Sequence, residues 1–279
     1  MIDFLKTMAE GSAQRAAAIR RTFAARDFDL PILPLNPSEF DLIAEIKDSS
    51  PSEGQLATHA AGRADRALQY VQGGATAISV LTEPSRFGGE LGHLREVANA
   101  VSGSSVPVMR KDFLVDTKQI LEARAAGASG VLLIVALLER KKLMNMLHCA
   151  FEHSLFVLLE SFDEVDLKAT HELLQDAQMA DRAAHGQLLV GINARDLRSL
   201  AVDPERLAEL ASRLPEQAIA VAESGLRSAG DAATAASLGY RMALVGTALM
   251  REPNPAVMIN EMLLAGRAAA AEQEEIRTA

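Results

Sequence analysis

The 279-residue sequence is poor in residue types that several classes of protein require. Its single cysteine, Cys149, excludes a disulfide framework or a cysteine-based metal cluster within one chain. No apolar run approaches the roughly 20 residues of a membrane-spanning helix. The N-terminal segment MIDFLKTMAEGSAQRAAAIR is too polar for a signal peptide. We therefore expect a cytoplasmic enzyme or binding protein.

Basic residues are also scarce. Lysine and arginine total 28 against 37 acidic residues, which gives a net charge of −9 and a pI near 5.2. This balance argues against nucleic acid or an anionic membrane as a partner. An anionic small molecule would need a local basic pocket. We expect a small-molecule ligand and a monomer or weak homo-oligomer.

The sequence offers little for a metal site or a nucleophilic triad. Its six histidines fall in predicted helices or loops, with no close His-x-His pair at a strand end. No Ser-His-Asp order or Cys-His pair stands out. We therefore predict no metal, and the remaining chemistry is acid–base work by lysine and glutamate, with arginine and asparagine for orientation.

What is present is an alternation of short apolar runs with longer helical patterns. Hydrophobic residues make up 49% of the chain, enough for one sizeable core. The expected strands are 42–46, 76–82, 106–109, 130–136, 155–160, 188–193, 218–223 and 242–246. Helical spacing marks 116–126, 139–153 and 203–213, with helix starts at Asp116 and Asp203.

Continuous apolar strands that alternate with helices indicate a parallel sheet covered on both faces. Eight such units predict a (β/α)8 TIM barrel. We treat 1–279 as a single barrel domain with 1–40 as an N-terminal helical extension, in which about 3–26 has helical character. A doubly wound open sheet is the alternative, but no GxGxxG follows the first strand.

Polar residues gather where the expected strands end. In the first strand, Glu45 and Lys47 are two residues apart and share one face, which is costly in a buried strand unless the pair serves a site. Active sites of this fold lie at the C-terminal ends of the strands. The candidates there are Glu45, Lys47, Ser50, Lys111, Phe113, Glu160, Asn193, Arg195, Glu223, Ser224, Gly225, Gly246 and Thr247.

The last two strand ends predict a phosphate site. ESGLRS brings small residues, Ser224 and Gly225, after the seventh strand, and Gly246 and Thr247 open a short helix after the eighth. Backbone N–H groups of such loops, together with a helix N-terminus, bind phosphate in this fold. A phosphorylated substrate is therefore expected.

These residues stand in motifs that resemble the indole-3-glycerol phosphate synthase family. The motifs are ExKxxSPS (45–52), PVMRKDF (107–113), LLE (158–160), GINARDL (191–197), AESG (222–225) and LVGTALMR (244–251). The resemblance implies conversion of 1-(2-carboxyphenylamino)-1-deoxyribulose 5-phosphate to indole-3-glycerol phosphate without a cofactor. This is a carboxy-lyase reaction of tryptophan biosynthesis, made of ring closure, decarboxylation and dehydration.

The resemblance also implies a role for each candidate residue. Lys111 would be the general acid of ring closure, Glu160 and Lys47 would transfer protons during dehydration, and Glu45 and Asn193 would orient these groups. Substrate binding would fall to Ser50, Phe113, Arg195, Glu223 and Ser224, and phosphate binding to Gly225, Gly246 and Thr247.

The sequence departs from the family pattern at several positions. Asp48 and Glu53 stand where basic residues are usual, Glu90 replaces the serine of FxGS, and LLESF replaces LVEVH. Three of these changes add negative charge near the rim. A paralogue that acts on a substituted anthranilate-derived substrate, a Schiff-base lyase or isomerase of sugar phosphates, and a non-catalytic phosphate-binding barrel therefore stay open.

Overall fold

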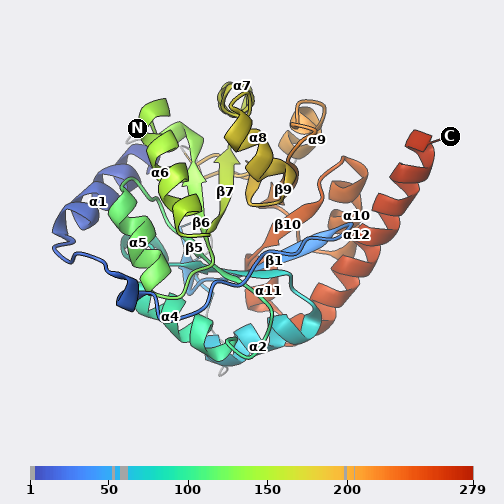
Figure 1. Ribbon diagram of the computed structural model, residues 1–279. Coiled ribbons are helices and arrows are strands. Elements are labelled where there is room, and N and C mark those ends of the chain that lie inside the picture. Colours follow the sequence, from blue (N-terminus) through green and yellow to red (C-terminus); the bar gives the residue numbers. More distant parts are fainter. Residues whose placement is uncertain (1–3, 52–53, 57–61, 198–199, 204, 279) are drawn as a thin grey trace.

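Eight parallel strands close into a barrel in the computed structural model, which describes residues 4–51, 54–56, 62–197, 200–203 and 205–278 (Figure 1). The order around the barrel is β1-β10-β9-β8-β7-β6-β5-β4. The strands are β1 (Asp41–Ile46), β4 (Ala77–Leu81), β5 (Val108–Lys111), β6 (Gly130–Ile134), β7 (Phe156–Ser161), β8 (Leu188–Asn193), β9 (Ile219–Glu223) and β10 (Met242–Val245). The predicted (β/α)8 barrel is confirmed, and each predicted strand overlaps one of these.

Helices surround the barrel and connect its strands. They are α1 (Phe4–Ala18), α2 (Arg63–Gly73), α3 (Pro84–Phe87), α4 (Leu91–Ala100), α5 (Thr117–Ala125), α6 (Arg140–Glu152), α7 (Glu164–Leu173), α8 (Ala177–Ala184), α9 (Arg206–Ala211), α10 (Ala229–Ser237), α11 (Thr247–Arg251) and α12 (Pro255–Thr278). Two 3₁₀ turns, η1 (Ala25–Asp27) and η2 (Val135–Leu137), and a small antiparallel pair, β2 (Ser49–Ser50) with β3 (Gly54–Gln55), complete the described chain. None of the described helices is long and apolar enough to cross a membrane.

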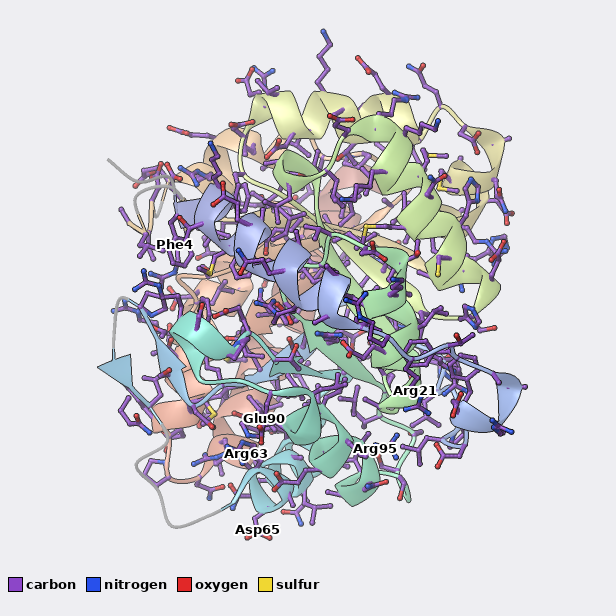
Figure 2. The ribbon with its side chains drawn as sticks, turned by 90° about the vertical axis from the view of Figure 1, so that its left-hand side faces the viewer. Phe4, Arg21, Arg63, Asp65, Glu90 and Arg95 are labelled. Atoms are coloured by element: carbon purple, nitrogen blue, oxygen red, sulfur yellow. The ribbon has the colours of Figure 1, made fainter. Side chains whose placement is uncertain are left out.

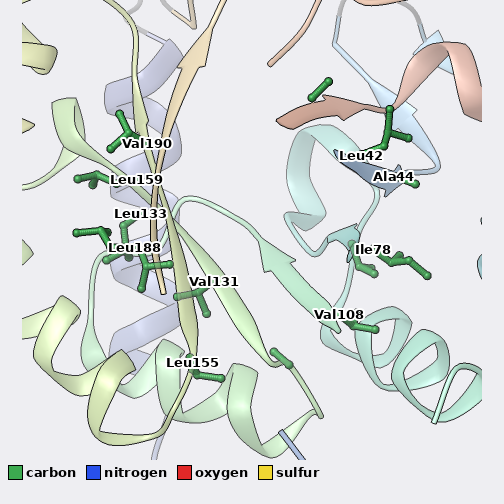
Figure 3. Close-up of a cluster of buried hydrophobic side chains, with 14 of the residues drawn as sticks. Leu42, Ala44, Ile78, Val108, Val131, Leu133, Leu155, Leu159, Leu188 and Val190 are labelled. Atoms are coloured by element: carbon green, nitrogen blue, oxygen red, sulfur yellow. The ribbon is translucent and has the colours of Figure 1, made fainter. Parts of the chain in front are cut away.

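Alternate strand residues pack outward against the helices. Leu42, Ala44 and Ile46 of β1 belong to a large buried cluster that also holds Val157 and Leu159 of β7. Figure 3 shows side chains of this cluster on several neighbouring strands. Because successive strand residues point to opposite faces, the residues between them face the barrel interior.

The barrel interior is polar at the C-terminal ends of the strands and apolar in the layers nearer their N-terminal ends. Ile43, Met109, Leu158 and Val221 belong to the inner cluster. Two residues beyond each of these, the same face carries Glu45, Lys111, Glu160 and Glu223. The strand period therefore places four charged side chains in one layer, at the end of the barrel where sites form.

Helix α1 covers this end of the barrel. Its Leu5 and Met8 are buried in the inner cluster, together with Phe113 and Leu197 of the loops after β5 and β8. The helix ends at Ala18 and does not continue to about residue 26 as the sequence pattern predicted. The buried face of α1 packs against the C-terminal end of the barrel, and the connector after Ala18 follows the outside of the barrel. Tertiary contacts therefore override the helix-forming composition of the connector.

The predicted helix start at Asp203 is wrong. Helix α9 begins at Arg206, because the residues before it pair back onto the loop after β8. Val202 forms a β-bridge with Arg195, and the Asp203 N–H donates to the Ala194 carbonyl at 2.8 Å. These two contacts hold the loop after β8 beside the cavity, and α9 begins only after them.

Candidate active site

A cavity opens at the C-terminal ends of the barrel strands, as the position of the polar layer predicts. Of the residues singled out from the sequence, the cavity is lined by Glu45, Lys47, Lys111, Phe113, Glu160, Asn193, Arg195, Ser224, Gly225, Gly246 and Thr247. Glu223 and Ser50 do not line it. The fold thus brings together side chains that lie up to about two hundred residues apart.

Lys111 stands at the centre of three carboxyl groups. Its Nζ lies 2.9 Å from Glu223 Oε2, 3.6 Å from Glu160 Oε2 and 3.8 Å from Glu45 Oε2. The lysine side chain is 15% exposed, whereas Glu223 is fully buried beneath it. Glu223 therefore does not line the cavity and lies beneath Lys111, which does.

Glu45 and Lys47 form the ion pair that the first strand suggested. Lys47 Nζ lies 2.6 Å from Glu45 Oε1. A Cβ at Gly246 would lie 2.2 Å from the same oxygen and 2.9 Å from the lysine nitrogen. The glycine after β10 thus provides the space in which this pair lies, a role additional to its predicted place near the phosphate.

Glu160 is held between an amide and a second carboxyl group. Asn193 Nδ2 donates to Glu160 Oε2 at 3.2 Å, and Glu160 Oε1 is buried without a hydrogen-bond partner among the described residues. Glu223 Oε1 is in the same situation. A Cβ at Gly191, which pairs with Glu160 across the β7–β8 ladder, would lie 2.1 Å from this Glu223 oxygen. Glycine at that inward position is needed to accommodate the carboxyl pair.

The protonation states follow from burial and these contacts. Burial raises the pKa of Glu160, and the negative charge of Glu223 raises it further, so that it lies well above its ordinary value despite Lys111 and Asn193. Burial alone would lower the pKa of Lys111, but Glu223, Glu160 and Glu45 raise it above its ordinary value. Burial would raise the pKa of Glu45, yet Lys47 and Lys111 hold it below its ordinary value.

Two lysine side chains and three carboxyl groups thus share the site, and the raised pKa of Glu160 favours a proton on that carboxyl group. The arrangement provides an ammonium group, Lys111, a carboxyl group of raised pKa, Glu160, and a carboxyl group of lowered pKa, Glu45, around one cavity. Such groups can donate and accept protons at neighbouring substrate atoms.

The part of the cavity after β9 and β10 is suited to a phosphate group. Ser224 and Gly225 both have positive φ, +66° and +84°, which turns the chain sharply after β9. Gly246 and Thr247 begin α11 beside them, and Arg195 and Arg227 also line the cavity. Sequence reasoning missed Arg227, although it lies two residues beyond Gly225 in the motif that was singled out.

The cavity lining also includes apolar and aromatic side chains. Phe87 and Phe113 line the cavity with ring centroids 6.2 Å apart, and Phe4 of α1 lies at the same distance from Phe113. Leu132 and Ile134 of β6 extend this apolar wall. Phe87 was not predicted, and the FGG sequence that follows β4 is the only signal that pointed to it.

Two of the unusual acidic residues, Asp48 and Glu90, lie outside the cavity lining. Asp48 pairs with Arg63 at the start of α2, and Glu90 Oε1 lies 3.1 Å from His93 Nε2. Neither acidic residue lines the cavity, and Glu53 lies outside the described residues. Two of the added negative charges are therefore engaged by cationic or titratable side chains outside the site.

Ser50 lies in the short strand β2, which pairs with β3 beside the first barrel strand, and its side chain is buried. Within the described ranges, no group of three or more histidine, cysteine, aspartate or glutamate side chains is arranged to hold a metal ion.

Comparison with known proteins agrees with the motifs. The family model for indole-3-glycerol phosphate synthase matches residues 5–262. Curated indole-3-glycerol phosphate synthases are similar over most of the chain. That of Nocardioides sp. is 40% identical and covers 90% of this chain and 91% of its own. That of Leifsonia xyli subsp. xyli is 39% identical and covers 93% and 98%.

Solved structures support the fold alone. The 3-hexulose-6-phosphate synthase of Salmonella typhimurium is 16% identical, with a TM-score of 0.61 over 84% of this chain and 100% of its own. The thiamine phosphate pyrophosphorylase of Pyrococcus furiosus is 14% identical, with a TM-score of 0.56 over 83% and 97%.

Fold and site together define a (β/α)8-barrel enzyme with an acid–base cluster of lysine and glutamate at the C-terminal ends of its strands. The family match makes the class a carboxy-lyase of tryptophan biosynthesis. More particularly, the chain belongs to the indole-3-glycerol phosphate synthase family.

Proposed function

We propose that this chain converts 1-(2-carboxyphenylamino)-1-deoxyribulose 5-phosphate to indole-3-glycerol phosphate, carbon dioxide and water. The observation that carries the proposal is the contact set of Lys111, whose ammonium group faces the cavity while three carboxyl groups lie within 3.8 Å. A charged, well-held amine in that position is a general acid for a carbonyl oxygen.

Ring closure comes first. The aromatic carbon that bears the carboxylate attacks the ketone carbon, and Lys111 donates a proton to the oxygen as negative charge develops there. Loss of carbon dioxide leaves its bonding electrons in the ring and restores aromaticity, so this step needs no electron-sink cofactor. Phe113 and Phe87 supply the apolar wall against which the aromatic ring packs.

Dehydration follows. The hydroxyl group formed from the ketone leaves as water after it receives a proton, and a second proton leaves the substrate to form the indole double bond. The carboxyl group of Glu160, whose pKa is raised, and the Lys47 ammonium group exchange these protons, while Asn193 and Glu45 orient them. Arg195, Ser224, Gly225, Gly246 and Thr247 bind the phosphate and the polar chain.

The unsubstituted substrate is favoured over a substituted anthranilate derivative. Two of the departures that suggested a paralogue, Asp48 and Glu90, pair with Arg63 and His93 and do not line the cavity. A Schiff-base lyase is disfavoured by the raised pKa of Lys111, since an amine nucleophile must be neutral. Borohydride in the presence of substrate would trap a covalent adduct only on a Schiff-base enzyme.

Lys111→Ala tests the proposal. We expect kcat to fall by about 100-fold or more, the scale of general acid catalysis, with the protein still folded. Lys118→Ala is the matched control because Lys118 is exposed on the next helix, α5, and it should keep wild-type turnover. Wild-type kcat in folded Lys111→Ala protein would contradict the assignment.

A further inference from the structure

Arg15 of α1 connects two strand ends of the barrel. Its Nη2 donates to Asp112 Oδ1 at 2.7 Å, and its Nη1 lies 3.5 Å from Glu83 Oε1. The Asp112 and Glu83 side chains are at most 1% exposed, whereas Arg15 is 29% exposed. Because Glu83 follows β4 and Asp112 follows β5, one guanidinium group bridges the two neighbouring loops that carry cavity residues.

Asp112 is fixed by several hydrogen bonds besides that of Arg15. Its Oδ2 accepts from Thr82 Oγ1 at 2.9 Å and from Arg110 Nη2 at 3.0 Å. Its Oδ1 accepts from the Phe113 N–H at 2.8 Å. Asp112 lies between Lys111 and Phe113 in the chain, so the position of its carboxylate constrains the backbone on both sides.

Glu83 constrains the neighbouring loop in the same way. It is the N-cap of α3, and its carboxylate accepts the N–H groups of Ser85, Arg86 and Phe87. Phe87 is packed against Phe113, with ring centroids 6.2 Å apart. A shift of Glu83 would therefore move the aromatic wall of the cavity.

A second contact keeps α1 in register with the same region. Gln119 Nε2 donates to the buried Ser12 Oγ at 2.8 Å, and Gln119 Oε1 accepts the Val115 N–H at 2.8 Å. Helix α1 is thus bonded to the segment after Lys111 at two points. Of these two contacts, that of Arg15 is the one that brings a charged group to the loops after both β4 and β5.

We propose that Arg15 is a positioning residue, which acts through Asp112 and Glu83 to hold Lys111 and the two cavity phenylalanines in working geometry. Arg15 does not itself line the cavity, so it does not touch the substrate. The proposal rests on the role proposed for Lys111. Its effect should be large because a misplacement of about 1 Å in a reacting group can cost about 100-fold in rate.

Arg15 can be replaced by a small molecule from the outside. It borders a groove formed with Ile19, Leu91 and Arg95, between the end of α1 and helices α4 and α5. Figure 2 shows Arg21 and Arg95 on this face of the molecule, beyond the end of α1 opposite Phe4. A methylguanidinium ion that enters the groove can approach Asp112 when the arginine side chain has been removed.

The test compares Arg15→Ala, Arg15→Lys and the control Arg20→Ala, an exposed arginine in the connector. We expect Arg15→Ala to lower kcat by about 10- to 100-fold, with a smaller change in KM. Arg15→Lys should retain more kcat than Arg15→Ala, since lysine keeps the positive charge but lacks the planar guanidinium group that contacts two carboxylates at once. Methylguanidinium should restore Arg15→Ala activity saturably and leave Arg20→Ala unchanged.

A second readout does not depend on turnover. Acylation of Lys111, followed by mass spectrometry, should become several-fold faster in Arg15→Ala than in wild type, and methylguanidinium should slow it again. Unchanged Lys111 labelling, or wild-type kcat in Arg15→Ala, overturns the proposal. If Arg15→Ala alters labelling while wild-type protein makes no product, the proposed function fails and the positioning role stands.

Discussion

Among single residues, Glu160 links the stability of the protein to pH. Its native pKa lies well above the ordinary carboxyl value because of burial and Glu223. As pH rises through the ordinary carboxyl range, near about 4.3, the unfolded chain loses this proton first. The native state then binds more protons than the unfolded state, so this group lowers the free energy of unfolding until its native pKa is passed.

Glu160→Gln tests this sign, because glutamine has no such proton to lose. The difference in unfolding free energy, variant minus wild type, should increase as pH rises from the ordinary carboxyl range to the raised native pKa. Urea unfolding at a series of pH values measures it. Glu209→Gln, at an exposed position of α9, is the control and should show no such trend. Parallel curves for Glu160→Gln and wild type would contradict the raised pKa.

Gly246 offers a second test at this scale. In Gly246→Ala the added methyl group would meet Glu45 Oε1 at 2.2 Å, so the Glu45–Lys47 pair must separate. We expect kcat/KM to fall by at least about 10-fold through the displaced ion pair. Gly103→Ala, where a Cβ meets nothing within 4 Å, should leave kinetics unchanged. Equal kinetics in the two variants would remove this role from Gly246.

The sequence pointed to the acid–base residues because their positions depend only on strand period and strand ends. It did not show that Glu223 lies beneath Lys111 or that Gly191 makes room for it. Both facts depend on the register between β8 and β9, in which Asn193 pairs with Glu223. Cross-strand register is a tertiary property, and one apolar strand sequence is compatible with several registers.

Among the secondary-structure elements, α5 is the best specified by its sequence. Asp116 caps it by accepting the Lys118 N–H at 2.9 Å, and Gln119 Oε1 accepts the Asp116 N–H at 3.1 Å. This capping box is a local signal, and the helix begins at Thr117 as its predicted start at Asp116 implies. By contrast, the end of α1 and the start of α9 differ from prediction. Packing against the C-terminal end of the barrel determines the former, and contacts with the loop after β8 determine the latter.

Asp116→Ala should lower the free energy of unfolding by about 1 kcal/mol, the usual worth of an N-cap. Turnover at saturating substrate should stay close to that of wild type, since Asp116 does not line the cavity. Urea unfolding gives the stability, with Lys118→Ala on the same helix as the control. Unchanged stability would show that the cap adds nothing to the packing of α5.

For the whole molecule, the barrel explains why residues from strands far apart in the sequence reach one cavity. Parallel strands bring their C-terminal ends to one rim, so the sequence alone located the rim and most of its side chains. The role of α1 was less accessible. Leu5, Met8 and Arg15 of this helix contact barrel residues that lie about one hundred residues or more away along the chain. No local sequence pattern predicts such contacts.

Product formation by the purified wild-type chain tests the central claim most directly. The assay follows the fluorescence of indole-3-glycerol phosphate made from the unsubstituted 1-(2-carboxyphenylamino)-1-deoxyribulose 5-phosphate, without added metal or cofactor. We predict sustained turnover that Lys111→Ala lowers by about 100-fold or more and Lys118→Ala retains. Folded wild-type protein that makes no product from this substrate, while it turns over a ring-substituted analogue or none at all, would contradict the account.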